Sequence, residues 1–301
     1  MRIIRLPGLW ALGALLFGAV VACSGSQAST STPAPSPTLA RQTPELVVVL
    51  GSTDLAVGQN RVVFALLDSA GELMRQESVD LSFYYVEGSE ATAKGQATAV
   101  FRQGPYDRGV YVVQDSFDRA GTWILEVDSQ VSGQPITATA LFEVSETSTA
   151  PALGLPPPRS HNKTIKDVER LEELTTDSTP DEDLYSMTIA EALDAGIPLV
   201  VTFATPAFCQ SATCGPQVDV VEEVKAGYPG RANFIHVEVF DNPHEILGDM
   251  GNARLSPTME EWRLQSEPFT FVMDAEGNVA AKFEGFVTAE ELDLAVQETL
   301  S

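Results

Sequence analysis

Two of the three cysteines in this chain, Cys209 and Cys214, lie in the stretch FATPAFCQSATCGP with four residues between them. Cysteines this close can form a structural disulfide, exchange a disulfide with another thiol, or supply two thiolate ligands to a soft metal ion. The cellular compartment limits which of these three roles is possible, because disulfides persist outside the cytosol and are rare inside it. The elements around the pair then decide whether either sulfur is activated.

The first residues, MRIIRLPGLWALGALLFGAVVAC, indicate the compartment. Two arginines precede an apolar run that is too short for a comfortable membrane span. The run ends in Val-Val-Ala-Cys, which resembles the lipobox of bacterial lipoproteins. We therefore predict a signal peptide over residues 1–22, lipidation of Cys23, and an extracytoplasmic protein anchored by lipid to a bacterial cell membrane. A plain secretory signal and an uncleaved anchor helix are the alternatives.

The charge of the chain limits its partners. Among 301 residues, 42 are Asp or Glu and 18 are Lys or Arg, so the formal net charge is −24. A chain this acidic is a poor ligand for nucleic acid or for an anionic lipid surface. We expect no nucleic-acid partner, and contact with the membrane only through the N-terminal lipid.

Composition divides the chain into segments. Residues 23–44 are rich in Ser, Thr and Pro and predict an extended tether, and a second stretch of this kind predicts a linker over residues 147–165. Between them, residues 45–146 alternate apolar and polar side chains in about seven short runs, for example Val79 to Tyr85. Seven short strands in about 100 residues predict an all-β, immunoglobulin-like sandwich domain.

Residues 166–301 alternate helical and strand patterns, which predicts an α/β domain. Thr188 and Thr288 each begin a capping box, and PLVVTFA (198–204) is a run typical of a strand buried on both faces. The predicted elements are a helix after Thr188, a strand over 198–204, a helix over 216–226, a strand over 232–240, a hairpin over 269–284 and a helix after Thr288.

This order, with a cysteine pair between the first strand and the next helix, resembles the thioredoxin-like fold family from about Ile189 to Leu300. FATPAFC matches the strand end that leads to the family's first active-site cysteine, and EPFT (267–270) stands where the family has a cis-proline. The resemblance implies a thiol-disulfide oxidoreductase that exchanges disulfides with protein thiols. It also implies catalysis by Cys209 and Cys214, and substrate contacts from Phe208, Glu267 and Pro268.

The sequence departs from the family in two ways. Four residues separate the cysteines, where thioredoxins have two, so the pair is CxxxxC. Phe208 favours Cys209 as the attacking cysteine, whereas a helix that starts near Pro216 places Cys214 closer to the helix dipole. Thr202 occupies the position where many thioredoxins bury an acid that manages protons.

Two other hypotheses stay open at this level. The pair could be a structural disulfide in a non-catalytic binding or assembly lipoprotein. A copper-delivery protein would use the pair with a distant histidine, for which His244 is the candidate. The sequence has no phosphate-binding loop, no Ser/His/Asp arrangement and no other metal-binding cluster, so we assign no cofactor and no metal ligand.

Overall fold

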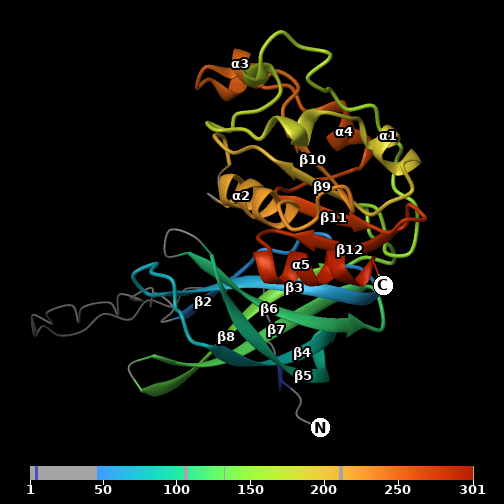
Figure 1. The fold of residues 1–301 in the computed structure, drawn as a ribbon. Coiled ribbons are helices and arrows are strands. Elements are labelled where there is room, and N and C mark those ends of the chain that lie inside the picture. The colour runs from blue at the N-terminus through green and yellow to red at the C-terminus, as the bar shows by residue number, and fades with distance from the viewer. Residues whose placement is uncertain (1–3, 6–45, 105–107, 132, 210–212, 301) are drawn as a thin grey trace, which may run out of the picture.

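The computed structural model describes residues 4–5, 46–104, 108–131, 133–209 and 213–300. Except for residues 4–5, the predicted signal peptide, the tether and Cys23 lie outside these ranges. Figure 1 shows an antiparallel sheet and a mixed α/β unit, with α5 and β12 at the junction beside β3. Within the described ranges, the model has no helix that combines the length and the apolar character needed to cross a membrane.

The first unit is antiparallel throughout, with the strand order β2-β3-β6-β5-β4-β7-β8, and β1 (Ile4–Arg5) pairs with β5. Its strands are β2 (Leu46–Leu50), β3 (Gly58–Asp68), β4 (Ser78–Glu87), β5 (Glu90–Gln103), β6 (Gly109–Phe117), β7 (Gly121–Val131) and β8 (Gln134–Val144).

An antiparallel β domain is therefore present where the strand pattern predicts one. Its seven main strands form one hydrogen-bonded path, whereas a sandwich has two separate sheets. The path curls so that its end strands β2 and β8 lie close together, and an isolated parallel bridge joins Ala56 to Ser145 nearby. A single apolar core, with side chains from both end strands, fills the inside.

Strand β4 keeps the alternation that its sequence predicts. Val79, Leu81 and Phe83 are buried, and the half-buried Tyr85 packs against the same core. The pairing of β4 with β7 is continuous, and the register shift between β4 and β5 comes from one extra residue in β5, Lys94. Such a bulge leaves one residue of a strand without an opposite partner and changes the local twist.

The second unit contains a four-stranded sheet of order β10-β9-β11-β12, in which only the β9–β10 pair is parallel. Its elements are η1 (Leu171–Glu173), η2 (Glu182–Tyr185), α1 (Ile189–Asp194), β9 (Leu199–Ala204), α2 (Cys214–Lys225), β10 (Asn233–Glu238), α3 (Pro243–Ile246), η3 (Met250–Asn252), α4 (Pro257–Glu261), β11 (Phe269–Met273), β12 (Val279–Glu284) and α5 (Ala289–Glu298).

Helices cover both faces of this sheet. Helices α2 and α5 pack on one face, and α1 and α4 pack on the other. Every residue of β9 is buried, which is what its unbroken apolar run predicts. Both predicted capping boxes are formed, at Thr188 before α1 and at Thr288 before α5. Packing on both faces therefore holds the ends of the strands, and the loops that follow them, in fixed positions.

The segment with linker composition packs against the α/β unit. The Gly154 N–H donates to the carbonyl of Val279 at 2.8 Å, and the Val279 N–H donates to the carbonyl of Leu155 at 3.0 Å. Farther along, the indole N–H of Trp262 donates to the hydroxyl of Ser160 at 3.0 Å in the buried core. Proline has no backbone N–H to donate. The Pro-rich segment can still pack here because these contacts require only a few backbone N–H groups.

The two units meet through a buried arginine. Arg61 of β3 is 8% exposed, and its guanidinium donates to the carbonyl of Phe286 at 2.9 Å and to that of Glu284 at 3.3 Å. It also forms an ion pair with Glu291 of α5, with 3.2 Å between Nη2 and Oε1. Beside it, Lys282 of β12 forms an ion pair with Asp54 at 2.8 Å. The β domain is thus joined to the α/β unit by partnered charges.

Candidate redox site

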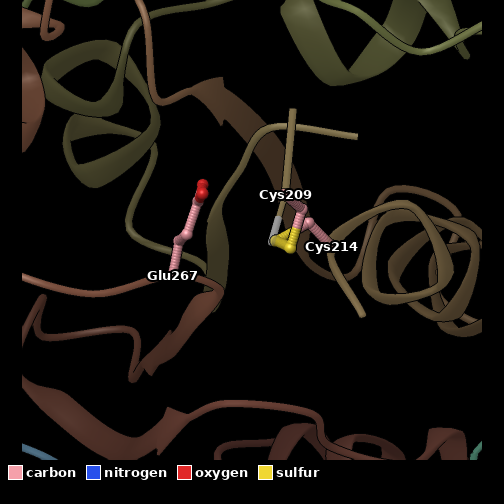
Figure 2. Close-up of side chains that lie close together, drawn as sticks. All are labelled: Cys209, Cys214 and Glu267. Atoms are coloured by element: carbon pink, nitrogen blue, oxygen red, sulfur yellow. A yellow bond between two sulfur atoms is a disulfide. The ribbon is translucent and has the colours of Figure 1, made fainter. Parts of the chain in front are cut away.

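The two cysteines are joined by a disulfide at the N-terminus of α2. Their Cα atoms are 5.9 Å apart, within the ordinary range for a bridge. Cys214 is fully buried, whereas Cys209, in the loop after β9, is partly exposed. Figure 2 shows the loop cysteine and the helix cysteine meeting beside Glu267. The four intervening residues therefore do not prevent the pair from closing.

Helix α2 begins at Cys214, two residues before the predicted start at Pro216. The helix can start before Pro216 because the N–H groups of a first turn have no partner within the helix, so a proline there removes no helical hydrogen bond. The first bond of α2 runs from the Gln217 N–H to the carbonyl of Thr213 at 2.9 Å, so Pro216 disrupts none. Helix α2 is described from end to end, and its first turn holds no acidic residue. These features favour a thiolate at Cys214.

Pro268 lies where the sequence places it. The Glu267–Pro268 peptide bond is cis and directly precedes β11, which pairs with β9 in the centre of the sheet. Phe208 is partly exposed, and its ring contacts that of Phe240 with 6.2 Å between centroids. The cysteine loop and the residues before β11 thus come together at one end of the sheet.

Glu267 lies closer to the chemistry than its predicted role of substrate contact suggests. One oxygen of its carboxylate and both cysteine sulfurs lie within 4.8 Å of one another. Its Oε2 is buried and has no hydrogen-bond partner among the residues that the structure describes. Burial raises the pKa of Glu267 to about 7, and the neighbouring Glu238 carboxylate adds to the rise, while the Thr205 backbone N–H opposes it.

Glu238, the last residue of β10, is the second carboxylate of this region and is 5% exposed. It accepts hydrogen bonds from the backbone N–H and the hydroxyl of Thr176, both at 2.9 Å. Burial raises the pKa of Glu238 although these bonds oppose the rise. The Thr176 hydroxyl also accepts from the Ala207 N–H at 3.0 Å. Glu238 therefore helps to hold the loop that carries Cys209.

His236 is buried and structural. Its Nε2 lies 3.0 Å from the carbonyl of Ala204 and its Nδ1 lies 2.7 Å from the hydroxyl of Tyr185. Because a carbonyl only accepts, the proton is on Nε2, and Nδ1 accepts from the tyrosine. Burial lowers the pKa of His236 to about 4, so the ring is neutral at pH 7. Both nitrogens are used within the protein.

The copper alternative gains no histidine from the described structure. There, the one group of three or more closely spaced potential metal ligands contains Cys209, Cys214 and Glu267. His244 is not in this group, and its Nε2 lies 3.8 Å from Glu245 in α3.

Thr202 fills the position that the family resemblance gives to an acid. It is fully buried in β9, and its hydroxyl lies 2.9 Å from that of Thr270 on β11. These two hydroxyls satisfy each other and offer no titrating group near pH 7. Sequence reasoning identified the missing acid but did not identify the buried Glu238 and the half-buried Glu267 as a pair of interacting carboxylates. The sequence feature that could have indicated the pair is their position: Glu238 ends one predicted strand and Glu267 comes shortly before another, at the end of the sheet where the cysteines lie.

Comparison with known proteins gives a structural likeness only. No protein-family model matches the sequence. No curated protein matches it either. Two solved structures from Chlorobium tepidum are similar to part of the chain, one a thioredoxin-family thiol:disulfide interchange protein and the other described as a thiol:disulfide interchange protein DsbE. They are 18% and 14% identical, each has a TM-score of 0.35, and each match covers 50% of this chain and 100% of the other.

Proposed function

We propose that this protein exchanges disulfides with the thiols of partner proteins through Cys209 and Cys214. The observation that carries the proposal is the disulfide at the N-terminus of α2, with one sulfur partly exposed and the other buried. A partner thiolate can reach an exposed sulfur, while a buried second cysteine is protected from other thiols. The cis peptide bond before Pro268 lies at the same end of the sheet.

The exposures of the two cysteines support a division of roles between them. A partner thiolate attacks the Cys209 sulfur, the Cys209–Cys214 bond breaks, and the Cys214 sulfur leaves with the electron pair of that bond. A second thiolate of the partner then attacks the mixed disulfide and releases Cys209 as a thiolate. The partner dithiol loses two electrons and becomes a disulfide. The protein disulfide gains them, and each of its sulfurs becomes a thiol or a thiolate.

The location of the protein belongs to the same proposal. A lipid on Cys23 and a tether over residues 23–44 would hold the domains outside the cytosol, where a disulfide can persist. The antiparallel domain would act as a spacer that the interface around Arg61 fixes to the α/β domain.

A redox titration with thiol labelling tests the proposal. The full chain is equilibrated in dithiothreitol or glutathione buffers, and the free cysteines are then counted by mass after alkylation. We expect a reversible two-electron transition in the range of exchanging disulfides. A potential below about −300 mV, together with no exchange with protein thiols, indicates a structural bridge and contradicts the proposal.

Trapping of mixed disulfides tests the roles of the two cysteines. If Cys209 is the attacking residue, Cys214→Ser should accumulate mixed disulfides with a disulfide-bonded protein substrate, because the Cys209 thiolate displaces one substrate sulfur and no second cysteine then resolves the bond. Cys209→Ser should accumulate far fewer, since Cys214 is buried. The reverse pattern would assign the attack to Cys214.

A further inference from the structure

Disulfide exchange needs a group that moves a proton at the buried sulfur. When the bridge opens, the Cys214 sulfur leaves as a thiolate in a site without solvent exposure, where a charged form is costly. Thr202 and Thr270 bond to each other and cannot supply a proton at neutral pH. Both nitrogens of His236 are occupied by Tyr185 and Ala204.

Glu267 has the position that this role requires. Its carboxylate oxygen lies within 4.8 Å of both sulfurs, a distance that one water molecule or the separation of the sulfurs on reduction can bridge. Oxygen Oε2 is buried and accepts no hydrogen bond from the described residues, so its lone pairs are not held by the fold. In Figure 2 the side chain extends alongside the disulfide, from the residue just before Pro268.

The groups around Glu267 favour its neutral form at moderate pH. The charged group whose field acts on it is Glu238 at the end of β10, and the cysteine loop and α2 contribute Cys209 and Cys214. Two carboxylates that share a buried region resist being ionised together. Glu238 is already held by Thr176, so Glu267 is the member of the pair that can keep or release a proton.

We infer that Glu267 is the general acid and general base of the exchange at Cys214. When a partner thiolate attacks Cys209, the carboxylic acid gives its proton to the leaving Cys214 sulfur, which forms a thiol and a carboxylate. In the opposite direction the carboxylate takes the proton from the Cys214 thiol. The resulting thiolate attacks Cys209 in the mixed disulfide and releases the partner thiolate. The inference rests on the proposed function and replaces the acid that Thr202 lacks.

Reduction of the oxidised full chain by dithiothreitol tests this inference. Rates are measured from about pH 5.5 to about pH 8.5 and divided by the thiolate fraction of dithiothreitol. For the wild type, the corrected rate should fall as pH rises through about 7, because the acid form of Glu267 is then lost. In Glu267→Gln the fall should disappear, and the rate below pH 6 should be about 100-fold lower.

Three further variants separate this role from a structural one. Glu267→Asp should keep the fall with pH, at a lower rate, because it keeps a carboxyl group. Glu238→Gln should move the fall to lower pH, since it removes the charge that helps to raise the pKa of Glu267. Glu276→Gln changes an exposed glutamate in the β11–β12 turn and should leave the profile unchanged.

The possible failures are distinguishable. If the wild type exchanges with dithiothreitol and Glu267→Gln retains both the rate and the pH profile, the inference is wrong and the proposed function stands. If Glu238→Gln leaves the position of the fall unchanged, the carboxylate pair is not the source of the profile. If the wild type exchanges with neither dithiothreitol nor a protein thiol, both the proposed function and the inference are overturned.

Discussion

The protein buries ionisable groups in two regions, and it treats them in opposite ways. At the domain junction, Arg61 pairs with Glu291 and donates to two backbone carbonyls, and its guanidinium lies over the ring of Phe283. At the cysteine pair, Glu267 has a buried oxygen without a partner in the described structure, and its charged neighbour Glu238 has the same sign.

This difference separates a structural site from a reactive one. A buried charge with a full set of partners holds two elements in one arrangement, and it is lost only with the fold. A carboxyl group with one buried and unpartnered oxygen can change its protonation state near neutral pH, which is costly for stability and useful for proton transfer. Three predictions test this difference, in order of decreasing expected effect on stability.

Removal of the buried arginine should have the largest effect. Arg61→Met leaves the Glu291 charge and two carbonyls without their donor, so we expect the free energy of unfolding to fall by about 3–5 kcal/mol. Urea unfolding can be followed by the fluorescence of Trp123 in the β domain and Trp262 in the α/β domain. Arg61→Met combined with Glu291→Gln should recover part of the loss. A loss below about 1 kcal/mol would show that the junction does not depend on this charge.

Neutralising Glu267 should have a smaller effect of the opposite sign. The pKa of Glu267 is raised from 4.5 to about 7, so the folded state holds a proton that the unfolded chain releases. The wild type should therefore lose stability as pH rises from about 4.5 to about 7, and Glu267→Gln should not. With a discount for partial solvent exposure, we expect the variant to be about 2 kcal/mol more stable at pH 8.

The pH dependence is the check on this second prediction. At pH 4.5 and below, the glutamate is protonated in the folded state, and the advantage of Glu267→Gln should vanish. Glu276→Gln, which changes an exposed glutamate, should match the wild type at both pH values. An advantage that persists unchanged at low pH would mean that shape, and not charge, distinguishes the two side chains.

An exposed ion pair should have the smallest effect. Arg159 and Asp194 lie 2.6 Å apart, but their side chains are 54% and 73% exposed. We expect Arg159→Ala to lower the free energy of unfolding by less than about 1 kcal/mol, and less still in high salt. A loss as large as that of Arg61→Met would contradict the view that burial and complete pairing set the scale.

Local patterns predicted much of the fold. The two capping boxes, the fully buried β9, the β11–β12 hairpin and the place of Pro268 were all visible in short stretches of sequence. Each depends on residues within a few positions of one another, which is why one-dimensional reasoning identifies them. The early start of α2 and the bulge in β5 were not predicted, because local hydrogen bonds and strand partners decide them.

The site divides along the same line. By itself, the sequence determined that Cys209 and Cys214 stand between a buried strand and a helix, with Glu267 and Pro268 before a later strand. Only the tertiary structure decided that the Glu267 carboxylate comes near the sulfurs, and that the charge of Glu238 from another strand acts on it. The reason is physical: backbone hydrogen bonding and apolar periodicity are local, whereas the pKa of a carboxyl group depends on burial and on charges that the fold brings from distant parts of the chain.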